Sequence, residues 1–346
     1  MKIAVIGGVG STRVLVEKLD QHGFKEVQVF GYQPQNTNLV SGWEDLKQFA
    51  INAGFSFTPF VKVNECQLPL EKFKPDWLFA VGLSQLLPFS MLALPKKGNI
   101  GFHPTALPVG RGRAPIAWLV LEQKDGAASF FLMREGVDNG PLLAQVPFVV
   151  GSEDDAATVE AKVLRAEATA LDGLLPAIRA GLIAPLEQDH SRATYYGRRT
   201  PEDGWLDWHA PAENLLSLIR ASTTPHPGAF SFQGMDKITI LQAMLPSRVL
   251  EKGVVGRILQ CQPDGTFLVQ CGVGHLRVTH WHATGNWQPR VGQKLGYYTE
   301  SEIHGLRQQI QVLEQRLASL EAFSNPGSAQ GEATMPRFTG SQKQEN

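Results

Sequence analysis

The stretch Lys2-Ile3-Ala4-Val5-Ile6-Gly7-Gly8-Val9-Gly10-Ser11, followed by residues 12–19, decides the fold class of this chain. The run from Lys2 to Ile6 has the apolar content of a buried strand, the glycines favour a tight turn, and residues 12–19 have a helical pattern. A strand, a glycine turn and a helix are typical of the opening unit of an α/β domain. Similar apolar runs at 27–30 and 77–81, alternating with helical stretches, predict a parallel sheet covered by helices on both faces.

The glycine turn resembles the start of a dinucleotide-binding fingerprint, but the resemblance is incomplete. Arg13 stands where a third small residue is needed, and no acidic residue follows the second strand, where the chain reads Gly31-Tyr32-Gln33-Pro34. We therefore interpret the turn as a tight connection between a strand and a helix, and we do not predict NAD binding.

Composition excludes several classes of protein. The chain has 346 residues with 32 Lys+Arg against 33 Asp+Glu, so it has no overall positive field that would favour nucleic acid as a partner. An apolar share of 43% is too high for a disordered chain, and no apolar stretch approaches the length of a membrane span. Cys66, Cys261 and Cys271 are widely spaced and form no CxxC pair, which favours a reducing compartment. We expect a soluble cytoplasmic protein without a metal site.

The change in residue pattern along the chain predicts two domains and an appended helix. An amphipathic helix is expected within 150–183, capped by Ser152 or Asp154 and ending near Gly181. From Trp205 to about 297 the chain becomes short β-like runs separated by Gly and Pro, typical of a small barrel-like domain. These runs are Lys237–Leu241, Gly253–Leu259, Thr266–Gln270 and His275–Thr279. The predicted domains are 1–190 and 205–297, followed by a helix over 302–323 and a disordered tail over 324–346.

Chemistry-bearing residues concentrate in two loops that follow predicted strands. His103 follows the run 100–102 and precedes Pro104, and a loop with Arg111 and Arg113 comes next. Asp138 follows the run 130–133. A histidine oriented by a carboxylate, with guanidinium groups nearby, is suited to proton transfer on a polar substrate. The residues alone leave open that the histidine is a loop hydrogen-bonder, that the aspartate forms a turn and that the arginines anchor the loop through salt bridges.

Three collinear motifs resemble the folate-dependent formyltransferases. The first is His103-Pro-Thr-Ala-Leu-Pro-Val-Gly-Arg-Gly-Arg-Ala-Pro115 with Val137-Asp-Asn-Gly-Pro141. The second is Tyr195 to Trp208, and the third is Arg220-Ala221 with Pro225-His-Pro-Gly-Ala-Phe230. Together they span about residues 1–297. The likeness is greatest to sugar-nucleotide N-formyltransferases, such as the domain acting on UDP-4-amino-4-deoxy-L-arabinose, and methionyl-tRNA formyltransferase is also similar.

This resemblance implies a Rossmann-like catalytic domain, an OB-like second domain and 10-formyltetrahydrofolate as the formyl donor. It further implies roles for nine residues. His103 and Asp138 are the expected catalytic pair; Gln85, Leu86 and Leu87 the expected pterin-binding segment; and Thr105, Arg111, Gly112 and Arg113 the expected contacts to the acceptor substrate.

One position departs from the family pattern. Where the family has an Asn that is thought to hold the formyl oxygen, this chain has Gly101. Asn99 lies on the same face of the strand, but two strand steps displace it by about 6–7 Å, so it cannot substitute directly. The retained His103 and Asp138 favour an altered site over an abandoned one.

The resemblance favours an N-formyltransferase that acts on an amino sugar attached to a nucleotide. Methionyl-tRNA formyltransferase uses the same chemistry, but the near-zero net charge gives no support for a tRNA partner. A formyltetrahydrofolate hydrolase and a catalytically altered scaffold or ligand sensor remain alternatives, the last because of Gly101 and the appended helix.

The C-terminal helix predicts a homodimer. Apolar residues follow a 3-4-3-4-3 spacing, with Ile at two of three a positions and Leu at all d positions, which favours a parallel two-stranded coiled coil. These residues are Ile303, Leu306, Ile310, Leu313, Leu317 and Leu320. The alternative is a single helix that packs this stripe on its own domain.

Overall fold

The computed structural model describes residues 1–37 and 40–324 and divides into two units. The first unit comprises residues 1–296, and the second begins at Tyr297. The predicted disorder of residues 325–346 lies outside the described residues.

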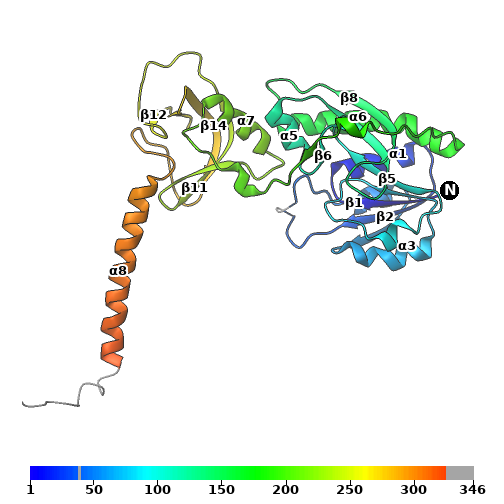
Figure 1. Ribbon diagram of the computed structural model, residues 1–346, viewed down its shortest axis with the longest axis horizontal. Helices are drawn as coiled ribbons and strands as arrows, with labels where there is room; N and C mark the ends of the chain where they lie inside the picture. The colour runs from blue at the N-terminus through cyan, green and yellow to red at the C-terminus, as the bar shows by residue number, and fades with distance from the viewer. Residues whose placement is uncertain (38–39, 325–346) are drawn as a thin grey trace, which may run out of the picture. The chain divides into compact units, whose positions relative to one another are not determined.

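A seven-stranded sheet in the order β3-β2-β1-β4-β5-β7-β8 forms the centre of the N-terminal part (Figure 1). Its strands are β1 (Lys2–Gly7), β2 (Glu26–Tyr32), β3 (Ser56–Phe60), β4 (Trp77–Ala80), β5 (Gly98–His103), β7 (Gly126–Leu132) and β8 (Leu142–Phe148). The first five run parallel, as predicted, but β7 pairs antiparallel with both β5 and β8. The parallel arrangement predicted for the sheet therefore holds for these five strands and does not extend to β7 and β8. The connection from His103 to Gly126 begins and ends at the same edge of the sheet, so β7 runs back along β5.

Helices cover both faces of this sheet, as expected (Figure 1). They are α1 (Gly10–Gln21), α2 (Lys47–Asn52), α3 (Gln67–Phe73), α4 (Phe89–Leu92), α5 (Pro115–Glu122) and α6 (Ala156–Ala180), with a short 3-10 turn at Val63–Cys66. The larger apolar core lies between the sheet and helices α1 and α6, and a smaller one lies on the opposite face beneath α3 and α4. The cap of α6 is Asp155, rather than Ser152 or Asp154, and Gly181 ends the helix in a left-handed conformation as predicted.

Thr12 closes the glycine turn between β1 and α1. The Gly8 backbone N–H donates to Thr12 Oγ1 at 3.1 Å, and that hydroxyl donates to the Val81 carbonyl at 2.7 Å. The turn is thereby tied to the end of β4, as expected of a tight connection between a strand and a helix.

The remainder of the first unit is built on an antiparallel five-stranded sheet in the order β10-β11-β14-β13-β12. Its elements are α7 (Ala212–Ser222), β10 (Ala229–Gln233), β11 (Asp236–Met244), β12 (Ile258–Cys261), β13 (Phe267–Gln270) and β14 (His275–Ala283), with 3-10 turns at His190–Arg192 and Pro201–Gly204. Trp208, Ile219 and Phe267 contribute to its own core. Three of the four predicted β-runs are confirmed, whereas residues 253–257 are turn and coil and the strand there begins only at Ile258. In the described part of the chain no ladder joins β10 to β12, so barrel closure stays a prediction.

Two very short strands form a third, two-stranded sheet. β6 (Arg111–Gly112) pairs in parallel with β9 (Tyr195–Tyr196), so the segment after α6 returns to the loop that follows β5. This pairing brings Tyr195 and Tyr196, which begin the second of the three motifs, against Arg111 and Gly112.

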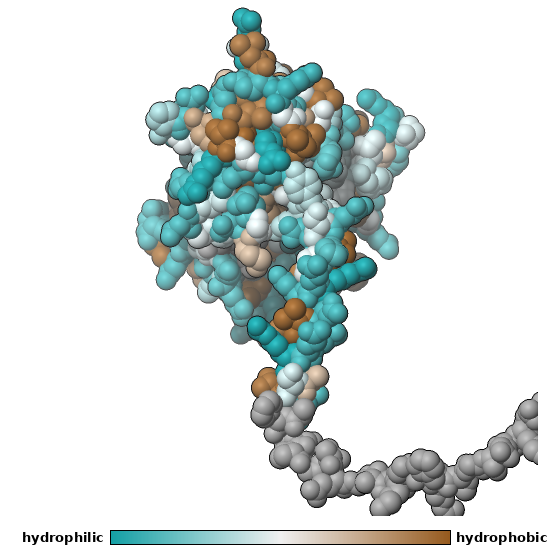
Figure 2. Space-filling model, turned by 90° about the vertical axis from the view of Figure 1, so that its left-hand side faces the viewer, coloured by the Kyte–Doolittle hydropathy of each residue, from teal (hydrophilic) through white to brown (hydrophobic). Residues whose placement is uncertain are grey.

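The second unit contains α8 (Thr299–Ser324), which confirms the predicted helix. Its six a and d side chains are 46–64% exposed, and Figure 2 shows apolar side chains exposed among hydrophilic ones along it. Among the described residues, no helix is both long and apolar enough to cross a bilayer.

Candidate functional site

His103 ends β5 and is almost completely buried. Its Nε2 lies 2.8 Å from the Gly110 carbonyl, which can only accept a hydrogen bond, so Nε2 carries the hydrogen in the neutral ring. The lone pair is then on Nδ1, which lies 3.6 Å from Asp138 Oδ2. A proton taken up at Nδ1 therefore creates an imidazolium that faces a carboxylate.

Asp138 reaches His103 by a route that the sequence does not show. His103 pairs with Ser129 and Ile100 with Leu132, so β7 ends at the edge of the sheet opposite to His103. The loop after β7 nevertheless returns Asp138 to the imidazole of His103. Within this loop Asp138 has a φ of 47°, an uncommon conformation for a residue other than glycine.

Gly112 fixes the carboxylate from the other side. Its backbone N–H donates to Asp138 Oδ2 at 2.9 Å. Its φ is 110°, and a Cβ there would lie 2.4 Å from the Tyr196 carbonyl, so only glycine fits this strand pair. Gly112, predicted to contact the acceptor substrate, thus holds the Asp138 carboxylate through its backbone N–H.

Phe131 occupies the space above Gly101. The two residues are paired between β5 and β7, and a Cβ on Gly101 would lie 2.6 Å from Phe131 Cζ. Asn99, two residues earlier, donates its amide to the Leu92 carbonyl at 2.8 Å and does not replace the missing side chain. An aromatic ring thus fills the volume that a longer residue at 101 would need.

Arg111 is 1% exposed, and its guanidinium is bound to protein groups other than carboxylates. Its guanidinium donates to Gln188 Oε1 from Nη2 at 2.7 Å and from Nε at 3.3 Å, to Tyr195 Oη at 3.1 Å, and lies 3.1 Å from His190 Nδ1. The structure does not turn this guanidinium toward solvent, where a substrate phosphate was expected to meet it. The salt-bridge alternative is not found either, since no carboxylate in the described residues pairs with Arg111.

Thr105 is likewise buried and engaged with the backbone. Its hydroxyl donates to the Gly110 carbonyl at 3.2 Å, and its own carbonyl accepts from Ser129 Oγ at 2.6 Å. Thr105 therefore shapes the loop that presents Gly110 to His103, instead of standing open to a ligand.

Arg113 differs from Arg111 in being exposed. Its backbone N–H donates to the Tyr196 carbonyl at 3.1 Å, while its guanidinium forms no hydrogen bond or ion pair with another described residue. Of the two predicted arginines, Arg113 is therefore the one whose guanidinium is exposed.

The segment 85–87 follows β4, which neighbours β5, so it lies at the same edge of the sheet as His103. The Gln85 amide is bound within the protein, accepting from the Val63 N–H and donating to the Val61 carbonyl, both at 2.9 Å. Leu87 packs on the smaller core, whereas Leu86 is 92% exposed. Of the three residues expected to hold a pterin, the structure leaves Leu86 open to a ligand, next to Phe89, which is 84% exposed.

Gln188 is a residue of this site that the sequence did not reveal. It is 5% exposed, accepts from Arg111 and donates from Nε2 to the carbonyls of Asp138 and Gly140 at 2.9 and 2.6 Å. No motif surrounds it, and only its contacts mark it.

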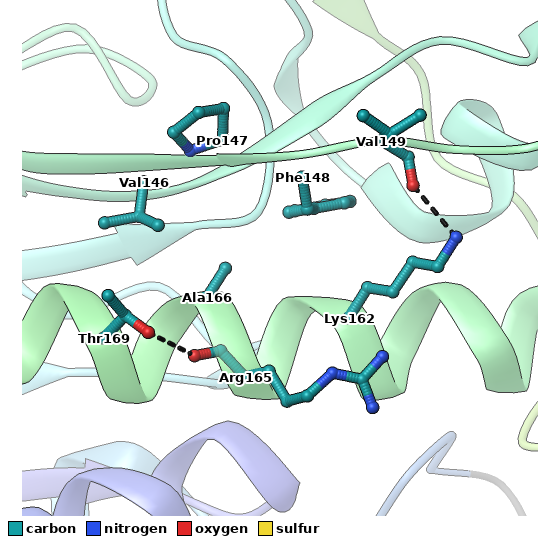
Figure 3. A pocket seen from close by; sticks show the side chains of 8 residues that line it. All are labelled: Val146, Pro147, Phe148, Val149, Lys162, Arg165, Ala166 and Thr169. Carbon is teal, nitrogen blue, oxygen red and sulfur yellow. Dashed lines mark hydrogen bonds between the residues drawn. The ribbon is translucent and has the colours of Figure 1, made fainter.

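A groove of ≈ 390 Å³ between β8 and α6 is separate from this constellation (Figure 3). Lys162 on its wall donates to the Val149 carbonyl at 3.0 Å, and Thr169 donates to the Arg165 carbonyl at 3.1 Å. None of the predicted site residues lines it. Nor does any group of three or more His, Cys, Asp or Glu residues within 1–37 and 40–324 have an arrangement that could hold a metal ion.

Comparison with known families identifies the chain. A family model described as formyl transferase matches residues 1–174, and one described as formyl transferase, C-terminal domain, matches residues 198–287. The chain belongs to the formyl transferase family. The resemblance of the three motifs is thereby confirmed, and this formyltransferase has His103 and Asp138 where the motifs place them.

Solved structures share the fold of this formyltransferase. The N-formyltransferase from Helicobacter canadensis in complex with folinic acid and dTDP-3-aminofucose has a TM-score of 0.61 at 14% identity, covering 82% of this chain and 100% of that one. HypX from Aquifex aeolicus in complex with tetrahydrofolic acid has 0.61 at 15%, covering 84% and 46%. Methionyl-tRNA formyltransferase from Clostridium thermocellum has 0.53 at 17%, covering 72% and 95%. At these identities the comparison shows the fold alone.

Proposed function

We propose that this formyltransferase transfers a formyl group from 10-formyltetrahydrofolate to the amine of an amino-sugar nucleotide. The observation that carries the proposal is the buried His103, whose Nδ1 lies 3.6 Å from Asp138 Oδ2 within a family whose chemistry is formyl transfer. The complex of the Helicobacter canadensis enzyme with folinic acid and dTDP-3-aminofucose supports this choice of donor and acceptor.

His103 is proposed as the proton acceptor. The amine must lose a proton as its nitrogen bonds to the formyl carbon, and Nδ1 is the ring atom with a free lone pair because Gly110 fixes the hydrogen on Nε2. Asp138 stabilises the imidazolium, and the Gly112 N–H holds its carboxylate in place. In the balanced reaction the proton released by the amine ends on the donor nitrogen that loses the formyl group.

Three exposed residues, Leu86, Phe89 and Arg113, suit these two ligands. Leu86 and Phe89 present two large apolar side chains that a planar pterin would shield from water. The guanidinium of Arg113 suits the phosphates of a nucleotide, because its planar fork donates two parallel hydrogen bonds. The bound donor would supply the formyl group, and the residues of the protein would orient the amine and accept its proton.

The test is mass spectrometry of amino-sugar nucleotides incubated with the enzyme and 10-formyltetrahydrofolate. We expect a product heavier by one formyl group. Formylated initiator methionyl-tRNA as the only product would support the tRNA alternative, free formate without an amine would support the hydrolase, and folate binding without turnover would support a sensor.

Variants of His103 and Asp138 test whether these two residues are needed for turnover. His103→Ala and Asp138→Ala are each expected to lower turnover by about 10²-fold or more, the usual scale for acid–base groups. The matched control is His209→Ala, because His209 Nδ1 lies 2.9 Å from Asp207 Oδ1 in an exposed His–Asp pair outside the site. Near-wild-type turnover in both site variants would exclude this site.

We further propose that α8 joins two copies of this chain in a parallel coiled coil. The six exposed a and d residues form a continuous stripe on a helix of 26 residues. In the parallel pairing Glu302 faces Arg307 of the other copy and Arg316 faces Glu321, so both charged pairs attract. The seam spans under three heptads, which is marginal alone, so contacts between the folded units are expected to reinforce the dimer.

Sedimentation of the full chain tests this proposal. We expect a dimer at micromolar concentration, dissociation by Leu313→Glu, and no change with Gln311→Glu, which adds the same charge outside the seam. Arg316→Glu is expected to weaken the dimer and Arg316→Glu with Glu321→Arg to restore it. A monomeric wild-type chain would contradict the proposal.

A further inference from the structure

Arg111 is a buried cation in an unusual setting. Buried charges are costly unless their hydrogen-bonding capacity is satisfied, and buried arginines commonly pair with carboxylates. Here the partners are the Gln188 amide, the Tyr195 hydroxyl and the His190 ring, and none of them is a carboxylate. The guanidinium is therefore committed to holding protein groups, and the group it holds with two donors is the Gln188 oxygen.

The contact with Arg111 fixes the orientation of Gln188. A guanidinium has donors only, so the oxygen of the amide must face it and the Nε2 group must face away. That Nε2 donates both of its hydrogens, one to the Asp138 carbonyl at 2.9 Å and one to the Gly140 carbonyl at 2.6 Å. The amide thus clamps both ends of the short turn from Asp138 to Gly140.

Two ties to Asp138 start from the same dipeptide. The Gly112 N–H binds the Asp138 carboxylate directly, at 2.9 Å. The Arg111 side chain binds its main chain through Gln188. Since Asp138 has a left-handed φ of 47°, its loop needs such external restraint to keep the carboxylate 3.6 Å from His103 Nδ1.

We propose that Arg111 and Gln188 are positioning residues that set the place of the Asp138 carboxylate opposite His103. This inference rests on the proposed function, because it assigns the two residues to the proton-transfer step. Both side chains are buried and bonded to protein groups. The assignment differs from a phosphate-binding role for Arg111 in a measurable way, since lost phosphate binding raises KM and lost positioning lowers kcat.

Two variants test the clamp. Gln188→Met keeps the length of the side chain but loses all its hydrogen bonds, and Gln188→Glu keeps an oxygen for Arg111 but loses both donations to the turn. We expect each to lower kcat roughly 10- to 100-fold, the scale of a misplacement near 1 Å, with KM for the acceptor changed less than about threefold. Gln28→Met is the matched control, because Gln28 Nε2 donates to Thr58 Oγ1 at 3.0 Å on β2 and β3, outside the candidate site.

A double-mutant cycle shows whether the clamp acts through Asp138. In the Asp138→Asn background, Gln188→Met should lower kcat no further. An additive loss, or a raised KM with unchanged kcat, would overturn the proposal. Gln188→Glu gives the same comparison if Gln188→Met fails to fold.

Hydrogen exchange of the Gly112 amide provides a readout that needs no substrate. This N–H is bonded to Asp138 Oδ2, so loosening the turn should accelerate its exchange in both Gln188 variants but not in Gln28→Met. If no acceptor is formylated but exchange accelerates, the proposed function fails and the positioning role stands. Unchanged exchange would refute the positioning role whatever the activity.

Discussion

Substitution of Gly101 probes the contact between β5 and β7 most directly. A Cβ at this position would lie 2.6 Å from Phe131 Cζ and 3.0 and 3.1 Å from Cε2 and Cε1. Carbon atoms pack at about 3.5–4.0 Å, so the ring must move by about 1 Å in a side chain that is 4% exposed. Overpacking of this kind costs about 1–3 kcal/mol, and the lower backbone entropy of alanine offsets about 0.5–1 kcal/mol.

We therefore expect Gly101→Ala to lower the free energy of unfolding by about 1–2 kcal/mol, measured by urea denaturation at 25 °C. Gly101→Asn should be at least as destabilising and should not gain turnover, since the ring occupies the space of its amide. The matched control is Gly173→Ala in α6, where a Cβ meets nothing within 4 Å and helix propensity predicts a gain of up to about 1 kcal/mol.

A smaller side chain at position 131 tests whether contact with Phe131 causes the loss of stability in Gly101→Ala. Phe131→Leu should reduce the penalty of Gly101→Ala, giving a coupling free energy of about 0.5–3 kcal/mol between the two changes. A Gly101→Ala variant as stable as the wild type, or strictly additive effects of the two substitutions, would refute the packing of Phe131 on Gly101.

Three further predictions follow from buried ionisable groups. Burial raises the pKa of Glu167 well above its usual value of 4.5, so the folded state binds a proton that the unfolded state releases as pH rises above 4.5. The free energy of unfolding of the wild type should therefore fall as pH rises above 4.5, and that of Glu167→Gln should fall less, as measured by urea denaturation at several pH values. Burial, with the Arg199 charge, lowers the pKa of His226 to about 4; stability should therefore fall as pH drops from about 6.5 towards 4, and less so in His226→Gln. Burial raises the pKa of both Cys66 and Cys271 to about 12, so a thiol reagent at pH 8 should modify Cys261 first in the native protein, checked by peptide mapping.

The local elements of this chain were readable from the sequence because their patterns are local. Apolar runs mark buried strands, and the runs ending at Ile6, Phe30 and Val81 correspond to β1, β2 and β4. The 3.6-residue pattern before Gly181 corresponds to α6, and the heptad spacing corresponds to α8. The clustering of His103, Asp138 and the arginine loop likewise marked the site, and the family models confirm the family they suggested.

Strand direction and the partners of buried polar groups were decided by the tertiary structure. The run of β7 is equally apolar in either direction, so its antiparallel pairing with β5 and the approach of Asp138 to His103 appear only in the folded chain. The sequence around Arg111 suggested a phosphate-binding role because it offers no partner for the guanidinium. The partner found in the structure, Gln188, lies 77 positions away in the chain. Periodicity records which face of an element is buried, whereas the identity of the atoms packed on that face depends on contacts between distant segments, so Phe131 over Gly101 and the clamp on Asp138 appear only when the chain is folded.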